Sequence, residues 1–144
     1  MSYNIMLSYL SYNIMSPNLS YNIMSPNLSY KDKIPLQNRK LEAGRMLNKY
    51  NDRIPVIVEK HSKSSNAPDI NKNKYLVPHD ITFGQFIYII RKRIKLDEEQ
   101  ALYTFINNRM PVTSDLMRTI YEKNASEDGL LYVNYAIENT FGSF

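Results

Sequence analysis

The feature that most constrains the fold of this chain is a sharp change in charge at residue 30. Residues 1–30 contain no acidic or basic side chain, and all 32 charged residues, 18 basic and 14 acidic, lie in residues 31–144. The uncharged segment is repetitive, because residues 11–19 recur unchanged as residues 20–28. A period of nine fits neither a helix nor a strand, and two copies are too few for a solenoid. We therefore predict that residues 1–30 are a low-complexity, disordered extension. Translation from Met24 would leave only a short leader.

The charged part is long enough for one compact domain. Its net charge of +4 is mild, which favours acidic partners or anionic membrane surfaces and argues against nucleic acid as a partner. A weak nucleic-acid binder is a less favoured possibility, and its affinity for nucleic acid would fall steeply as the salt concentration rises. No run of residues is apolar and long enough to span a bilayer, so contact with a membrane would need an anchor or recruitment.

The sequence contains no signature of catalysis. The absence of Cys excludes disulfides, thiol chemistry and Cys-based metal sites. There is no glycine-rich phosphate loop. His61 and His79 lie on loop-like segments without a nucleophile or a ligand spacing, and we expect both at the surface. We therefore predict a protein that is not an enzyme and that binds neither a metal nor a cofactor.

Hydrophobic periodicity and turn residues predict a β-β-α-β-α-β order behind an N-terminal helix. The expected elements are a helix over 36–50, strands over 53–60 and 75–77, a helix over 83–94, a strand over 101–106, a helix over 115–123 and a strand over 130–137. A mixed sheet that grasps a helix is the economical solution for this order. The sequence thus predicts an α+β fold, a ubiquitin-like β-grasp with a four-stranded mixed sheet and packed helices. The expected divisions are 31–52 for the N-terminal helical part, 53–138 for the core and 139–144 for a flexible tail.

Several details can be tested against the structure. Pro55 donates no backbone hydrogen bond and suggests an edge strand or a strand start. Thr113 or Ser114 is expected to cap the helix over 115–123. The strand over 75–77 follows a polar loop and ends at Pro78, so we expect an exposed edge. The expected buried side of the first helix consists of Leu36, Leu41, Met46, Leu47 and Tyr50.

Gly142 stands two residues before the last residue, in Phe141-Gly142-Ser143-Phe144. Without a Cβ atom, its backbone can thread a narrow enzyme cleft. After removal of the last two residues, its carboxylate would be unhindered and ready for transfer to an amine. Taken alone, a Phe-Gly pair near a terminus is more typical of a frayed chain end.

Blocks of residues along the charged part, in a fixed order, resemble one protein family. This part is similar to the autophagy ubiquitin-like modifiers, the group that contains autophagy-related protein 8, the GABA-receptor-associated protein and microtubule-associated protein light chain 3. The resemblance covers about residues 31–144 and has no counterpart in residues 1–30. The matching blocks are residues 49–60, 74–78, 84–86, 90–94, 105–108, 127–133 and 141–142.

The resemblance implies conjugation to a lipid. A cysteine protease would cut the Gly142–Ser143 bond after Phe141, and activating and conjugating enzymes would pass the Gly142 carboxyl to phosphatidylethanolamine. The lipid would be a covalent attachment and not a cofactor. The implied locations are the cytoplasm and the membranes of autophagosomes, cytoplasmic vesicles and the vacuole or lysosome.

The resemblance also implies recognition of peptides with an aromatic residue, two spacers and an aliphatic residue, as carried by cargo receptors and adaptors. The peptide would add a strand beside residues 74–77. The implied aromatic pocket consists of Glu42, Met46, Pro55, Lys74, Leu76 and Leu130, where Leu130 replaces a frequent aromatic residue. The implied aliphatic pocket consists of Tyr75, Val77, Pro78, Ile81, Phe86 and Ile89. Acidic neighbours of the motif would meet Arg53, Lys72, Lys74 and Arg93.

An alternative reading keeps the peptide site without the lipid. A trafficking or cytoskeletal adaptor would bind peptides and tubulin and would never be conjugated. The basic helix over 36–50 allows contact with membranes, partner proteins or microtubules, as similar N-terminal pieces do in the family. Gly142 discriminates between the two readings, because only the modifier needs it.

Overall fold

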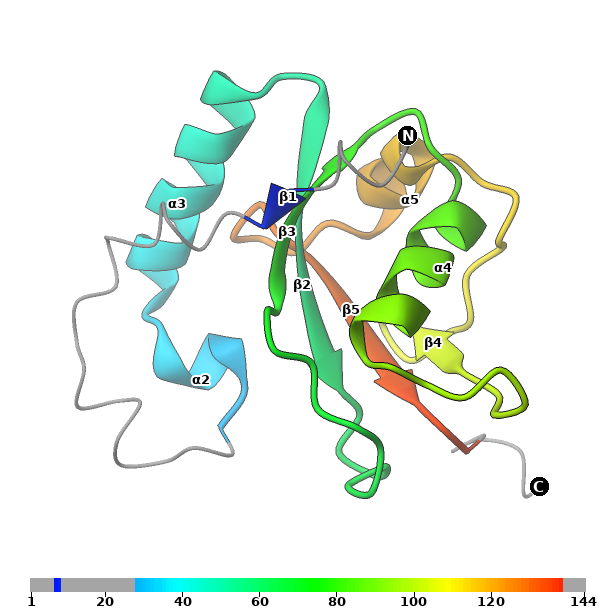
Figure 1. The fold of residues 1–144 in the computed structure, drawn as a ribbon. Helices are drawn as coiled ribbons and strands as arrows, with labels where there is room; N and C mark the ends of the chain where they lie inside the picture. Colours follow the sequence, from blue (N-terminus) through cyan, green and yellow to red (C-terminus); the bar gives the residue numbers. More distant parts are fainter. Residues whose placement is uncertain (1–6, 9–27, 139–144) are drawn as a thin grey trace.

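The computed structural model describes residues 7–8 and 28–138 of the chain. It confirms the predicted order of helices and strands (Figure 1). The elements are β1 (Leu7–Ser8), α2 (Tyr30–Lys33), α3 (Leu36–Lys49), β2 (Arg53–Lys60), β3 (Lys74–Pro78), α4 (Phe83–Arg93), β4 (Tyr103–Phe105), α5 (Met117–Asn124) and β5 (Leu131–Ala136).

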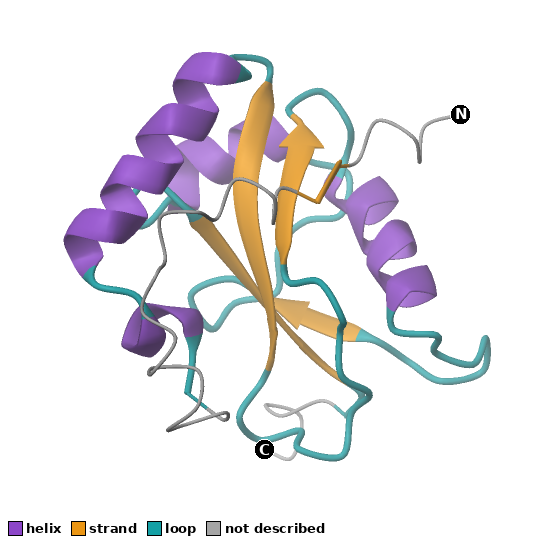
Figure 2. Ribbon diagram, turned by 60° about the vertical axis from the view of Figure 1, so that its left-hand side comes forward, coloured by secondary structure: helices purple, strands orange, loops and turns teal. Residues whose placement is uncertain are grey.

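The strands form one mixed sheet in the order β1-β3-β2-β5-β4. The pair β2 and β5 is parallel, and the other pairs are antiparallel. Helices α2 and α3 lie on one face of the sheet, and α4 and α5 cover the other (Figures 1 and 2). The four longer strands with their helices are the predicted α+β β-grasp.

Alternation along β2 separates two buried layers, because successive side chains of a strand point to opposite faces. Ile54, Val56 and Val58 belong to the main apolar cluster with α4 and α5. Ile57 points the other way and packs with residues of α2 and α3. Phe86, Ile89 and Ile90 of α4, with Ile94 directly after it, are buried in the same cluster.

Of the two possibilities drawn from Pro55, the edge strand is wrong, because β2 is the central strand and pairs on both sides. The strand start is confirmed, since Pro55 is the third residue of β2. The backbone N–H of Val58 donates to the carbonyl of Asn73, on the β3 side, at 2.8 Å. Backbone groups alternate in direction along a strand, so the nitrogen of Pro55 faces β5. Pairing with β5 begins only at Val56. The missing donor therefore removes no hydrogen bond between β2 and β3.

The buried side of α3 also differs from the prediction. The buried residues are Arg39, Glu42, Ala43 and Met46, and Leu41 is 57% exposed. These positions are spaced as one face of a helix. Two charged side chains lie on this face because both find partners in the folded domain, as described below. Met46 is confirmed as buried, but hydrophobicity alone missed the other residues of this face.

The predicted boundary at residue 30 and the predicted exposed edge are wrong as well. Ser29 caps α2 through its side chain, and Tyr30 is buried. Leu7–Ser8 pairs antiparallel with β3, with Leu7 opposite Leu76. The outer edge of β3 is therefore occupied over these positions. The disorder predicted for residues 1–6 and 9–27, and the flexible tail predicted for 139–144, lie outside the described residues.

Local chemistry explains some turns and helix starts and not others. Asn107 and Asn108 form a turn, with positive φ angles of 53° and 65°. Neither Thr113 nor Ser114 caps α5, which begins after Leu116 without a side-chain cap. His61 is buried and not at the surface, because its ring packs edge-on against Phe105, with centroids 5.6 Å apart.

Candidate peptide-docking site

Strand β3 presents its backbone alternately to β2 and to the outer edge of the sheet. Asn73 accepts from Val58, and the same register places Tyr75 opposite Val56. The backbone groups of Tyr75 therefore face β2, whereas those of Lys74 and Leu76 face outward. An added strand would find its central donor and acceptor at Leu76.

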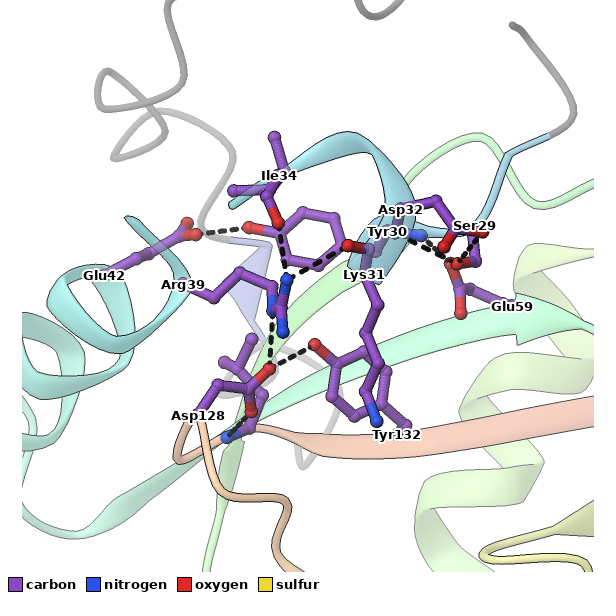
Figure 3. Close-up of polar contacts among 11 residues, drawn as sticks. Ser29, Tyr30, Lys31, Asp32, Ile34, Arg39, Glu42, Glu59, Asp128 and Tyr132 are labelled. Atoms are coloured by element: carbon purple, nitrogen blue, oxygen red, sulfur yellow. Dashed lines mark hydrogen bonds and ion pairs between the residues drawn. The ribbon is translucent and has the colours of Figure 1, made fainter. Parts of the chain in front are cut away.

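The residues of the implied aromatic pocket lie on the α3 side of this edge. Their side chains are buried against one another, so the pocket is closed. Lys74 Nζ lies 3.2 Å from Glu42 Oε2, and both side chains are 2% exposed. The hydroxyl of Tyr30 donates to the other oxygen of Glu42 (Figure 3). Lys74 Nζ also lies 4.7 Å from the centre of the Tyr30 ring. Tyr30 thus contacts Glu42 and Lys74 of the implied pocket, although sequence reasoning did not include it.

The other members of this pocket are also buried. Met46 and Leu76 pack together, and Leu130 packs with Tyr30 and Ala43. Burial lowers the pKa of Lys74, and the Glu42 carboxylate opposes this shift without cancelling it. The ion pair is therefore held in a dry layer between α3 and the sheet.

The residues of the implied aliphatic pocket lie on the α4 side of the same edge. Tyr75, Val77, Phe86 and Ile89 belong to the main apolar cluster, and Ile81 is half-buried against it. The rings of Tyr75 and Phe86 meet edge to face at 6.2 Å. An open hollow of about 500 Å³ adjoins this pocket, and Ile81, Ile89 and Tyr88 are among its lining residues.

Tyr75 carries an unusual polar group on this side. Its hydroxyl is buried and has no hydrogen-bond partner among the described residues. Burial raises the pKa of Tyr75 to about 12, and the charge of Arg93 acts in the opposite direction. The Arg93 guanidinium lies 5.6 Å from the centre of the Tyr75 ring.

The implied basic residues do not form one cluster. Lys72 precedes β3 and is exposed, whereas Arg53 lies opposite Pro78 at the other end of β3. Arg93 ends α4 and is exposed. Positive charge therefore flanks both ends of the β3 edge, and an acidic peptide along the edge would meet it at either end.

A second polar network, which sequence reasoning missed, fixes α2 and α3 to the sheet (Figure 3). Arg39 Nε donates to Asp128 Oδ2 at 2.8 Å, and the Tyr132 hydroxyl donates to the same oxygen at 2.6 Å. Asp128 Oδ1 accepts from the Leu130 N–H at 2.9 Å. Arg39 Nη1 also donates to the carbonyls of Lys31 and Ile34, at 3.0 and 2.5 Å.

The same network perturbs two acidic groups. The backbone N–H of Tyr30 donates to Glu59 Oε2 at 2.6 Å, but burial dominates and raises the pKa of Glu59. Burial and the hydrogen bond to Asp128 raise the pKa of Tyr132. No local signal could have revealed the Arg39–Asp128 pair, because its members are 89 residues apart.

The conjugation residues Phe141 and Gly142, with the Gly142–Ser143 bond, lie outside the described residues. Strand β5 ends at Ala136, six residues before Gly142. Within residues 28–138, no group of three or more His, Asp or Glu side chains is placed to hold a metal ion. None of the helices in the described part of the chain has the length and hydrophobicity needed to cross a membrane.

Known proteins place this fold in one family. The model of the family described as "Autophagy protein Atg8 ubiquitin like" matches residues 38–142. The chain belongs to the Atg8 family. Rice (Oryza sativa subsp. japonica) "Autophagy-related protein 8A" is 56% identical over 109 residues, which are 76% of this chain and 91% of the rice protein. Arabidopsis thaliana "Autophagy-related protein 8e" is 57% identical over 107 residues, or 74% of this chain and 87% of that protein.

Solved structures of Atg8 proteins share the fold. Trypanosoma brucei ATG8 is 37% identical, with a TM-score of 0.73 over 81% of this chain and 99% of that one. Plasmodium falciparum Atg8, solved in complex with an Atg3 peptide from the same organism, is 37% identical, with a TM-score of 0.72 over 78% of this chain and 98% of that one. The predicted family and the ubiquitin-like fold are thus confirmed.

Proposed function

We propose that this chain is an autophagy modifier whose Gly142 carboxyl is joined to phosphatidylethanolamine after cleavage of the Gly142–Ser143 bond. The Atg8 family match ends at residue 142, which supports Gly142 as the reacting residue. An amide to a two-chain lipid gives durable membrane binding, which one chain does not. The protein would then be a substrate of a tail-trimming protease and of conjugating enzymes, and not an enzyme itself.

We further propose that the conjugated protein recruits cargo receptors and adaptors through the β3 edge. The observation that carries this proposal is the arrangement of the two implied pockets. Glu42, Met46 and Leu76 lie on the α3 side of β3, while Phe86 and Ile89 lie on the α4 side. Side chains of a strand added at this edge would alternate between the two sides.

The Atg3 peptide in the complex with Plasmodium falciparum Atg8 supports a conjugating enzyme among the partners. Conjugation would place this protein on autophagosome membranes, cytoplasmic vesicles and the vacuole or lysosome, with an unconjugated pool in the cytoplasm. Microtubules stay a further candidate through the basic helix α3. The adaptor reading, without conjugation, shares the same peptide site.

Intact mass spectrometry after reconstitution tests the conjugation. The protein would be mixed with the protease, the activating and conjugating enzymes, ATP and phosphatidylethanolamine vesicles. We expect the wild type to lose Ser143-Phe144 and to gain the mass of the lipid, and Gly142→Ala to gain none. Ser143→Ala is the matched control, because it changes the neighbouring residue and leaves the glycine; it should react like the wild type. Retention of the last dipeptide without an adduct would leave the adaptor reading, whereas an adduct on Gly142→Ala would overturn Gly142 as the reacting residue.

A further inference from the structure

Strand β1 lies on the edge of β3 that an incoming peptide would need (Figure 1). It pairs antiparallel, with Leu7 opposite Leu76 and Ser8 opposite Tyr75. The outward-facing backbone groups of β3 belong to Lys74, Leu76 and Pro78, and Pro78 has no N–H. Leu7 therefore stands opposite the central donor and acceptor of this edge. One edge of a strand accepts one partner strand at a time.

The closed state of the aromatic side agrees with an occupied edge. Glu42, Met46, Lys74 and Leu76 are each no more than 2% exposed. The Glu42 carboxylate accepts from Tyr30 and pairs with Lys74, so both of its oxygens have partners within the chain. A peptide would need this layer to open as well as a free edge.

We propose that Leu7–Ser8 is an intramolecular pseudo-ligand, which closes the β3 edge to peptides until it is displaced. This inference rests on the proposed peptide-docking function and adds a regulation to it. Attachment to the same chain gives the segment a high effective concentration at the edge. A two-residue strand forms few hydrogen bonds, each worth about 0.5–1.5 kcal/mol, so a longer peptide can replace it.

The charge around the β3 edge favours replacement of β1 by an acidic peptide. Residues 1–30 contain no Asp or Glu, so this segment has no carboxylate to pair with the basic residues at the ends of β3. Lys72 and Arg93 are exposed in the described structure. An acidic peptide would gain these contacts on displacing β1, whereas an uncharged one would not. The pseudo-ligand thus selects for acidic motifs.

The full-length chain itself provides a matched pair of variants. Leu7 and Leu19 both begin a Leu-Ser-Tyr tripeptide, so Leu7→Pro and Leu19→Pro have the same mass and composition. Proline removes the N–H that a paired strand needs. Leu7 is paired with β3, whereas Leu19 lies outside the described residues.

Two measurements test the inference on these variants. The first is amide hydrogen exchange by NMR, where we expect the Leu76 amide to exchange faster in Leu7→Pro than in the wild type or Leu19→Pro. The Val77 amide faces β2 and should not change. The second is the fluorescence anisotropy of a labelled acidic peptide with a tryptophan and, three positions later, a leucine. We expect Leu7→Pro to bind it about five-fold more tightly or better, because a larger fraction of the protein is competent.

The outcomes separate the two proposals. Unchanged Leu76 exchange in Leu7→Pro would overturn the pseudo-ligand, whatever the peptide does. Faster exchange without binding of the peptide by any variant would support coverage of the edge by β1 and overturn the docking function. If Leu76 protection in the wild type depended on protein concentration, the edge would be covered by a second copy, and the intramolecular contact would be overturned.

Discussion

At the scale of single residues, two ion pairs of equal length show what burial does. Arg39–Asp128 and Lys60–Asp69 both span 2.8 Å. The Asp128 side chain is fully buried, whereas that of Asp69 is 87% exposed. Removing one member of a buried pair leaves an uncompensated charge, whereas an exposed pair contributes little. The two pairs should therefore respond very differently to the same substitution.

We expect Asp128→Asn to lower the free energy of unfolding by about 3 kcal/mol, because Arg39 would stay buried without its counter-charge. Asp69→Asn is the matched control and should change it by less than about 0.5 kcal/mol. Urea unfolding followed by circular dichroism measures both. Equal losses in the two variants would show that α2 and α3 do not depend on the buried carboxylate.

At the scale of elements, α4 and α5 begin in different ways. Thr82 accepts from the Gln85 N–H at 3.1 Å, and the Gln85 side chain accepts from the Thr82 N–H at 2.9 Å. This reciprocal capping box satisfies two donors at the start of α4. Helix α5 has no side-chain cap, and its first residue, Met117, donates instead to the carbonyl of Ile81 at 2.8 Å. A tertiary contact therefore satisfies a free N–H group at the start of α5, whereas a local side chain satisfies one at the start of α4.

Alanine substitution separates the two helix starts. Thr82→Ala should cost about 1 kcal/mol of stability, because the cap is lost. Ser114→Ala should lie within about 0.5 kcal/mol of the wild type, since Ser114 is exposed and caps nothing in the structure. Thermal unfolding of the two variants side by side is sufficient. A larger loss of stability for Ser114→Ala would show that Ser114 caps α5 after all, as the sequence predicted.

At the scale of the whole molecule, the sheet separates an apolar layer from a polar one. The α4 and α5 side is a continuous apolar cluster, whereas the α2 and α3 side contains the Arg39–Asp128 and Lys74–Glu42 pairs. Tyrosine hydroxyls are buried on both sides. Burial raises the pKa of Tyr75 and of Tyr135 to about 12, and it also raises that of Tyr132.

These tyrosines predict a loss of stability in alkali. Between the unfolded pKa of 10.0 and the folded value of about 12, Tyr75 and Tyr135 are ionised only when unfolded. The unfolded state then binds fewer protons, so stability is complete below pH 10 and falls as the pH rises through this window. Each tyrosine should lower the free energy of unfolding by up to about 1.4 kcal/mol per pH unit in this window. The lowered pKa of Lys74 acts only below its ordinary 10.5 and does not compensate at higher pH.

Urea unfolding from pH 9 to pH 12 measures this slope, and absorbance at 295 nm follows the ionisation. Tyr75→Phe should make the dependence of the free energy of unfolding on pH less steep, because the contribution of one tyrosine is removed. It should cost little at neutral pH, because the Tyr75 hydroxyl has no hydrogen-bond partner in the described part of the chain. An unchanged slope in this variant would show that Tyr75 ionises normally in the folded protein.

The order of the elements and most of their bounds could be predicted from local sequence patterns. Strand β2 was predicted with the bounds that the structure shows, and α4 to within one residue of its end. Both depend on local periodicity and turn residues, which a chain carries without any partner. The residues of the peptide site came from the family resemblance, and their pairing across the β3 edge stays a prediction.

Contacts between distant parts of the chain explain which side of α3 is buried, which strand contains Pro55 and which segment covers β3. Arg39 is buried because Asp128 meets it from 89 residues away, and Tyr30 because Glu59 and Glu42 accept from it. Local patterns treat charged residues as exposed, since burying a lone charge is costly. An oppositely charged partner lowers that cost. When the partner is distant in sequence, it reaches the buried charge only after the sheet has formed, so neighbouring residues do not reveal it.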